Sequence, residues 1–219
     1  MKIVPITYAE AMEWCLKKHY ARRKPMYQHS FAIVENGMVE GVVVYGRPPV
    51  QIEKAFKKSC NSDFTVYELV RLVVQSKTKN ACSFLVGGSL KLLQKNNIVV
   101  SYADTAQGHS GIVYQATNWI YTGANKAHDS EYVVNGKKMH PKTITERYGI
   151  TAIAKWAEEN GVERIPPKEK HRYIYINADR KTKRNILSNM PYKAVTEYPK
   201  SEKTMYDDGD KIEMVAPFI

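Results

Sequence analysis

The sequence predicts a mixed α/β domain with a central, mostly antiparallel sheet flanked by helices. Two Asn-Gly pairs, Asn36-Gly37 and Asn135-Gly136, each lie between alternating apolar residues and mark β-hairpins. Between them, short apolar runs alternate with segments of helical spacing. The 219 residues are 43% hydrophobic, enough for one sizeable core. We therefore expect a single domain over residues 1–219, in which 204–219 form an acidic tail that packs as an edge segment.

Each expected element follows from a local signal. Thr7 and Glu10 fit the capping box of a first helix, whose apolar stripe ends at His19. The central strand, helix and strand form a β-α-β connection, so the two strands should be parallel neighbours. In chain order the predicted elements are a helix ending near residue 19, strands 30–34 and 38–45, helix 50–58, strand 67–74, helix 81–94, strand 97–102, helix 110–119, the second hairpin, helix 151–160, strand 172–176 and helix 181–187.

Charge and cysteine content narrow the class of protein. There are 33 Lys and Arg against 22 Asp and Glu, a net charge of +11, which makes a polyanionic partner plausible. Three cysteines without Cys-x-x-Cys spacing support neither a disulfide framework nor a thiolate zinc site. The apolar runs are too short to cross a bilayer, and the start of the chain leads into an amphipathic helix, so we expect a cytoplasmic protein with no membrane partner.

The segment 101–123 holds the densest group of chemically active residues. Asp104 falls where a strand ends, a common position for a site residue in α/β proteins. Tyr114 and Asn118 stand four residues apart and are expected on one helical face. Gly108 and Gly111 would let the backbone approach a ligand closely. The alternative is structural: Asp104 caps a helix, Tyr114 lies in the core and His109 lies on the surface.

This segment resembles the signature of the Mom family of bacteriophage DNA-modification proteins. The matching motifs are Ala103-Asp104, Gly108-His109-Ser110-Gly111, Tyr114-Gln115-Ala116-Thr117-Asn118-Trp119 and Tyr121-Thr122-Gly123. The likeness extends to Trp14-Cys15-Leu16-Lys17-Lys18-His19-Tyr20, Tyr45-Gly46-Arg47-Pro48-Pro49, Glu68-Leu69-Val70-Arg71-Leu72, Lys170-His171-Arg172-Tyr173-Ile174-Tyr175 and Tyr198-Pro199-Lys200. It therefore covers most of the chain from about His19 to Lys200.

The resemblance implies a divergent branch of the GNAT acyltransferase fold. The activity it implies is the addition of a carbamoylmethyl-type group to the exocyclic amino group of adenine in DNA, which protects phage DNA from host restriction. An enzyme of this kind would act in the cytoplasm of the bacterial host. Two alternatives stay open: an acyl-CoA-dependent GNAT acyltransferase that acts on a small amine or a protein, and a non-catalytic basic DNA-binding phage protein.

The resemblance also implies a set of site residues. His19, Tyr20, Asp104 and Tyr114 form a nitrogen and oxygen ligand set without thiolate, for which iron is the implied metal. Without a metal, Asp104 would be a base or an orienting group and Tyr114 an acid. Ser89 follows two glycines in a predicted helix and is a weaker catalytic candidate.

One departure from the GNAT pattern concerns the cofactor. Ordinary GNAT enzymes hold the pyrophosphate of acyl-CoA in a glycine-rich turn before the central helix. Here residues 75–81 contain no glycine, which argues against acyl-CoA in the usual pose and leaves the group donor unidentified. Lys77, Lys79 and Asn80 are candidates for a phosphate contact of a cofactor or of DNA; the alternative is a solvated turn.

Double-stranded DNA is the expected partner, and an oligomeric state, such as a dimer, is left open. An enzyme that modifies a paired amino group should take the base out of the stack and hold it against aromatic faces, for which Tyr102, Tyr114, Trp119 and Tyr121 are available. Basic residues of the second hairpin, the late strand and the last helix could follow the phosphate backbone. The candidates for contacts with substrate or DNA are Arg71, His109, Asn118, Lys137, Lys138, Lys142, Arg172, Lys181, Lys183 and Arg184.

Overall fold

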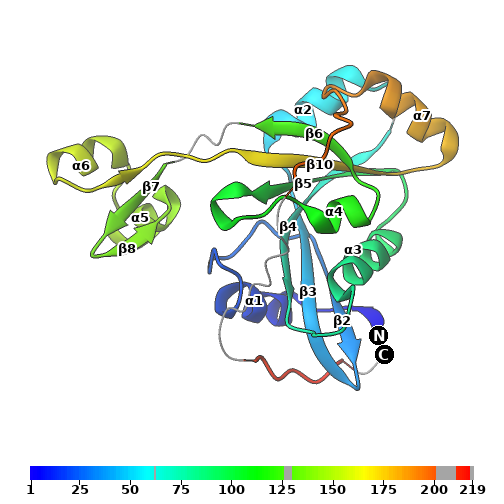
Figure 1. Cartoon of the computed structure of the whole chain (residues 1–219), viewed down its shortest axis with the longest axis horizontal. Coiled ribbons are helices and arrows are strands. Elements are labelled where there is room, and N and C mark those ends of the chain that lie inside the picture. The colour runs from blue at the N-terminus through cyan, green and yellow to red at the C-terminus, as the bar shows by residue number, and fades with distance from the viewer. Residues whose placement is uncertain (62, 126–129, 201–210, 218–219) are drawn as a thin grey trace.

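A seven-stranded sheet forms the centre of the molecule in the computed structural model, which describes residues 1–61, 63–125, 130–200 and 211–217. Its strands run in the order β1-β2-β3-β4-β5-β10-β6 (Figure 1). The strands are β1 (Lys2–Pro5), β2 (His29–Glu35), β3 (Met38–Gly46), β4 (Thr65–Val74), β5 (Asn97–Asp104), β10 (Lys170–Asn177) and β6 (Ile120–Asn125). All neighbours are antiparallel except β4 and β5, which are parallel. This confirms the mixed α/β class and the parallel central pair; β1 is a strand that the sequence patterns did not predict.

Local sequence signals explain the edges of several elements. Thr7 and Glu10 form the predicted capping box at the start of α1 (Tyr8–Lys17). Asn36 and Gly37 both have positive φ, which suits the two-residue turn between β2 and β3. The remaining helices of the main body are α2 (Val50–Ser59), α3 (Ala81–Leu92), α4 (Ile112–Ala116) and α7 (Arg180–Asn189).

The helices cover the sheet from both sides. On one face, α3 and α4 pack over an aromatic core that includes Tyr114, Trp119 and Tyr173. On the other face there are two separate apolar clusters, one beneath α1 and one beneath α2 and α7. Along β4, Val66 belongs to the second of these clusters and Val70 to the first. The residues of β4 between Val66 and Val70 therefore mark the boundary between two cores.

The parallel strands diverge where this boundary lies. β4 and β5 are paired only from Thr65 and Asn97 to Glu68 and Val100. Beyond that point the strands have no backbone ladder, and the Ser101 hydroxyl of β5 donates a hydrogen bond of 3.0 Å to the backbone carbonyl of Leu69 on β4. The carboxyl ends of the two strands are therefore separated.

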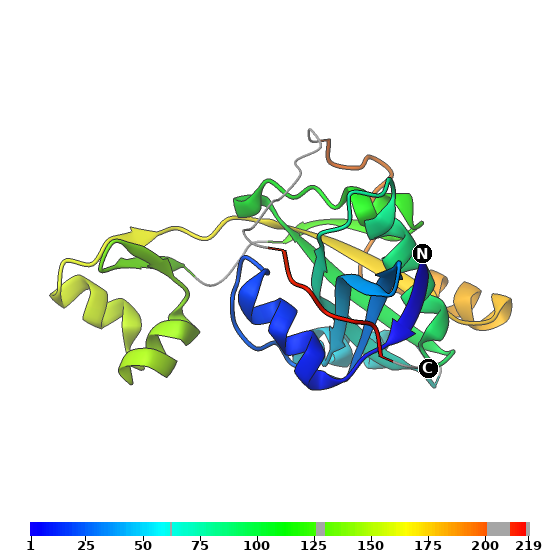
Figure 2. The ribbon, with the colours of Figure 1, turned by 90° about the horizontal axis from the view of Figure 1, so that it is seen from below.

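A smaller unit is inserted between β6 and β10. It consists of β7 (Glu131–Val134), β8 (Lys137–Met139), α5 (Pro141–Tyr148), α6 (Ile153–Glu159) and β9 (Arg164–Ile165). It has its own apolar cluster, centred on Ile144. Both views show this unit extending from one end of the main body (Figures 1 and 2). The second hairpin is present as predicted, whereas α5 was missed, because its eight residues include only one buried apolar side chain.

The described part of the chain near the C-terminus, residues 211–217, lies along the β2–β3 hairpin. Val39 donates a backbone hydrogen bond to Met214, and Ala216 donates one to Gly37. The side chain of Ile212 is buried in the cluster beneath α1. Residues 204–210 and 218–219 of the predicted acidic tail lie outside the described residues.

Cys15, Cys60 and Cys82 are all free thiols; the first two are buried, as expected, and Cys82 is exposed. Within the described ranges, none of the helices has the length and apolar character needed to cross a bilayer.

Candidate functional site

A polar group occupies the boundary between the two cores on β4. The register between β3 and β4 shifts between Leu69 and Arg71, which leaves Val70 as an extra residue, a β-bulge. The bulge breaks the strict alternation of side chains. Arg71 therefore lies on the same face as Glu68, so that a carboxylate and a guanidinium share the strip between the α1 cluster and the α2–α7 cluster.

Glu68 is the half-buried acid of this group. Burial raises its pKa to about 7, against the opposing effect of the positive charges of Arg71, Lys170 and Lys142. In the described part of the chain its carboxylate has no hydrogen bond or ion pair. A carboxylate in this state can accept a proton from a bound group.

His19 and Tyr20 approach the same region from the end of α1. The helix ends at Lys17, so His19 belongs to the following turn and not to the helical stripe, although it is only 7% exposed. Its Nδ1 accepts a hydrogen bond of 3.1 Å from the backbone N–H of Ala21, which places the proton of the neutral ring on Nε2. Burial, together with Arg71, His109 and Arg23, lowers the pKa of His19 to about 3. The imidazole is therefore neutral.

Tyr20 is the accessible aromatic ring of the group. Its side chain is 36% exposed, its ring lies 4.2 Å from that of His19, and it meets the ring of His109 edge-on at 5.9 Å. Tyr20 also acts electrostatically on Tyr114. The structure thus brings His19, Tyr20 and His109 together at this end of the sheet.

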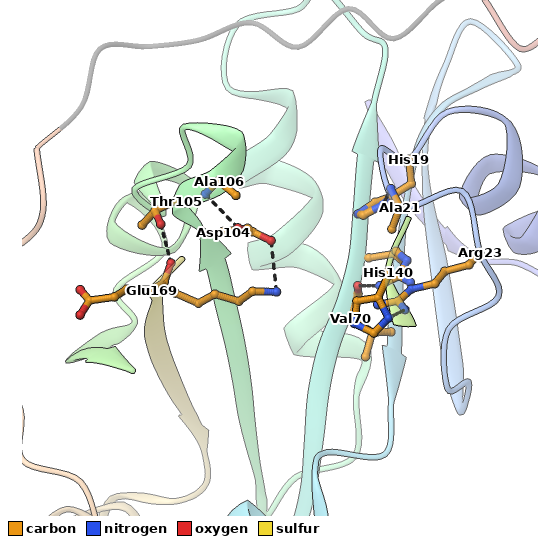
Figure 3. Close-up of polar contacts among 11 residues, drawn as sticks. His19, Ala21, Arg23, Val70, Asp104, Thr105, Ala106, His140 and Glu169 are labelled. Carbon is orange, nitrogen blue, oxygen red and sulfur yellow. Dashed lines mark hydrogen bonds and ion pairs between the residues drawn. The ribbon is translucent and has the colours of Figure 1, made fainter. Parts of the chain in front are cut away.

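Asp104 occupies the end of β5, as predicted. One carboxylate oxygen accepts a hydrogen bond from the N–H of Ala106 at 3.0 Å, and the other forms an ion pair of 3.1 Å with Lys170 on β10. Figure 3 shows this ion pair as a dashed line from the carboxylate of Asp104. Asp104 is therefore both a cap for the short 3-10 helix Thr105–Gln107 and one half of an ion pair.

Tyr114 lies beneath this group in the aromatic core. Its hydroxyl shares a hydrogen bond of 2.7 Å with Ser101, and its ring packs against Trp119 and Tyr173. Burial raises the pKa of Tyr114 far above that of a free phenol. Tyr114 is therefore a neutral phenol whose hydroxyl joins the aromatic core to β5.

The two glycines of the Gly-His-Ser-Gly motif differ in what requires a glycine at each position. Both have positive φ, +70° at Gly108 and +83° at Gly111. A Cβ at Gly111 would lie 2.3 Å from the ring of Tyr173, whereas a Cβ at Gly108 would meet nothing within 4 Å. Gly111 is thus required by close packing against a buried tyrosine, which the sequence alone could not show.

The predicted iron ligands do not fit a metal site as they are arranged. His19 Nδ1 is occupied by Ala21, Asp104 is paired with Lys170, and Tyr114 is a hydrogen-bonded neutral phenol. Within the described residues there is also no group of three or more His, Cys, Asp or Glu side chains suited to a metal. Iron stays a prediction of the resemblance. Metal analysis of protein purified without chelators, with His19→Ala as control, tests it: equal iron in both would remove this ligand set.

Ser89 and Asn118 have positions that differ from the predicted ones. Ser89 is fully buried and bonds to the hydroxyl of Tyr45 at 2.7 Å, so it is a core residue that substrate does not reach. The adjacent Gly88 accommodates the side chain of Ile3, which would lie 2.1 Å from a Cβ there. Asn118 does not share a helical face with Tyr114, because α4 ends at Ala116 and Asn118 has φ +61°.

The turn before α3 is built on a carboxylate. Glu35 of the β2–β3 hairpin accepts hydrogen bonds from Ser76 and Thr78 at 2.8 and 3.0 Å. Gln75 bonds both backbone groups of Ile212. Lys77, Lys79 and Asn80 are exposed in this turn. The hydrogen bonds of the turn connect it to Glu35 and Ile212 and not to Asp104.

The predicted DNA-contact residues fall into separate groups. Arg172 packs over the ring of Tyr192 at 3.6 Å and bonds to Thr122, which accounts for its guanidinium within the fold. Lys142 is exposed at the start of α5, and its charge acts on Glu68. The others are exposed away from the polar group: Lys137 and Lys138 on β8, and Lys181, Lys183 and Arg184 on α7.

Sequence reasoning missed two members of the group. Arg23, in the loop after α1, contacts Nδ1 of His140 at 3.0 Å and so joins the inserted unit to the main body (Figure 3). Glu68 is not among the candidates from sequence, whereas Arg71 is, because the bulge that aligns the two residues has no signature in the sequence. The available signal is that Glu68 and Arg71 are the two charged residues of a largely apolar strand.

Comparison with known proteins identifies the chain. No curated protein matches it. The model of the Mom protein family matches residues 1–200, which include every residue of the group described here. This range includes the whole of the seven-stranded sheet and the inserted unit. The chain therefore belongs to the Mom protein family, which is associated with the modification of adenine in phage DNA.

Proposed function

We propose that this protein is an enzyme that transfers a carbamoylmethyl-type group to the exocyclic amino group of adenine in double-stranded DNA. Family membership over residues 1–200 supports the substrate class. The observation that carries the catalytic part is Glu68, a half-buried carboxylate that forms no hydrogen bond or ion pair in the described part of the chain and lies beside Arg71 where β4 and β5 diverge. An enzyme of this kind, with a divergent GNAT-type fold, would act in the host cytoplasm, where phage DNA is replicated.

The reaction requires a proton acceptor. The amino nitrogen of adenine forms a bond to carbon of the donor, the donor's leaving group departs with its electron pair, and the nitrogen loses one proton. Glu68 is placed to take this proton, because burial has already brought its pKa to about 7. Asp104, held by Ala106 and Lys170, orients the site from the end of β5.

The amino group is paired in duplex DNA, so the base must leave the stack before it reacts. Of the aromatic residues considered from sequence, Tyr114, Trp119 and Tyr121 are buried core residues. Tyr20 is exposed and stands beside His19 and His109, so it is the ring available to stack on an extruded base. Exposed Lys142 at the start of α5 is the nearest candidate for a phosphate contact.

Mass spectrometry of nucleosides from cells that express the protein tests this function. The wild-type protein should yield a modified deoxyadenosine heavier by one carbamoylmethyl group, and Glu68→Gln should abolish it. Ser89→Ala is the matched control, because Ser89 lies in the core and should leave the modification present. DNA from the wild-type culture should also resist restriction enzymes that cut at adenine-containing sites. Unmodified DNA from cells that hold folded wild-type protein would refute the proposal.

A GNAT acyltransferase that uses acyl-CoA is a less supported alternative. The turn before α3, where the pyrophosphate would bind, is engaged by the carboxylate of Glu35. An acidic side chain in this position repels a phosphate group. Tight binding of acetyl-CoA by the purified protein would favour this alternative.

A further inference from the structure

Arg71 is a half-buried cation that forms no ion pair in the described part of the chain. Its Nη1 donates a hydrogen bond of 2.6 Å to the carbonyl of Val70, while its buried Nε has no hydrogen-bond partner. In the described part of the chain no carboxylate lies within ion-pair distance of its guanidinium. A buried charge is costly unless it is paired, so an unpaired guanidinium at a site indicates a ligand that supplies the negative charge.

The neighbours of Arg71 add to this excess of positive charge. Burial lowers the pKa of Arg71, and the charge of Arg23 lowers it further. Arg23 is held in place by its contact with His140, at the start of α5 (Figure 3). Within the group as a whole, four cations stand against two carboxylates: Arg23, Arg71, Lys142 and Lys170 against Glu68 and Asp104.

The position of Arg71 decides between two sources of the anion. A phosphate of the DNA backbone can reach exposed side chains such as Lys142, but Arg71 lies on a central strand of the sheet, next to the cluster beneath α1. Because Arg71 is half-buried at this position, we expect a small molecule, or a small part of one, to reach it. A guanidinium matches the two oxygens of a carboxylate or phosphate group in a fork geometry.

We propose that Arg71 and Arg23 bind an oxyanion, a carboxylate or phosphate group, of the small molecule that donates the transferred group. This inference rests on the proposed function and names the chemical class of its second substrate. The bulge at Val70 places this anion beside Glu68, so that the donor and the proton acceptor lie on one face of the sheet. The contact between Arg23 and His140 makes the inserted unit part of the donor site.

Thermal unfolding of the full chain tests this site. Sodium acetate and inorganic phosphate are added separately and compared with sodium chloride at the same ionic strength. An anion present at ten times its dissociation constant should raise Tm by about 3–6 °C. Arg23→Gln and Arg71→Gln should lose this rise, whereas Lys24→Gln, which removes the same charge one residue away on the same loop, should keep it. Arg71→Lys keeps the charge without the fork and should lose most of the rise.

The outcomes separate this inference from its alternatives. If Arg71→Gln does not fold, the comparison of Arg23→Gln with Lys24→Gln decides the question alone. Equal Tm values in acetate, phosphate and chloride, or the same rise in Arg23→Gln as in the wild type, would overturn the inference. Loss of affinity for a short duplex in Arg23→Gln but not in Lys24→Gln, without any effect of the small anions, would assign these residues to DNA phosphate and also overturn it. Modified deoxyadenosine in cells combined with no anion effect refutes only this site; an anion effect without modified nucleoside refutes only the proposed function.

Discussion

Replacing Gly111 by alanine should destabilise the protein much more than the same change at Gly108, although both glycines belong to one motif. Both substitutions force an L residue to adopt positive φ, at a cost of about 1–2 kcal/mol. At Gly111 the new Cβ would also lie 2.3 Å from Cε2 and 2.7 Å from Cζ of Tyr173. That ring cannot move freely, because it is fully buried and its hydroxyl donates to the carbonyl of Ser110. Overpacking of this kind adds about 1–3 kcal/mol.

Urea unfolding measures the difference. Gly108→Ala should lower the free energy of unfolding by about 1–2 kcal/mol and Gly111→Ala by about 2–5 kcal/mol, with an unchanged dependence on urea in each case. Because Tyr173 packs on Tyr114, Gly111→Ala should also reduce the modification of DNA even where it folds. Equal destabilisation by the two substitutions would show that the contact with Tyr173 does not determine the glycine.

Three further predictions concern Glu68, Asp104 and Ser89. The pKa of Glu68 is raised from 4.5 to about 7, so its contribution to stability is fully present below pH 4.5 and is lost as the pH rises through 7. In urea unfolding, the free energy of unfolding of Glu68→Gln should therefore rise relative to that of the wild type by at most about 3 kcal/mol across this window. Identical pH profiles of the two proteins would refute the assignment. Asp104→Asn should abolish modified deoxyadenosine in nucleoside digests at an unchanged level of folded protein; undiminished modification would remove Asp104 from the site. Ser89→Ala should cost about 1–3 kcal/mol, because it leaves the buried hydroxyl of Tyr45 without its partner, while the rate per folded molecule stays that of the wild type.

Much of the fold could be predicted because its signals are local. The capping box of Thr7 and Glu10 and the two Asn-Gly turns depend on a few neighbouring residues, and the structure contains all three. α4 is shorter than its apolar spacing predicts, because Asn118 adopts a left-handed conformation that ends the helical face. α5 begins with Pro141 and has a weak apolar stripe, so no periodic signal announces it.

The site was less predictable because it depends on contacts between distant segments. Asp104 could be placed at a strand end from the pattern of β5 alone. The alignment of Glu68 with Arg71 depends on a register shift against β3, which no property of β4 by itself reveals. Ser89 illustrates the converse error: a hydroxyl after two glycines suggested a ligand, whereas Ile3 and Tyr45 fill the space.

The inserted unit has a further consequence for how such proteins can diversify. Asn125 and Lys170, the residues on either side of it, are directly paired in the ladder between β6 and β10. The inserted unit, described over residues 130–169, thus takes the place of a hairpin turn between β6 and β10, and its replacement would not shift the register of either strand. Evolution, or a protein engineer, could therefore exchange the module at this junction without disturbing the main sheet, but the exchange would also remove His140 and its contact with Arg23.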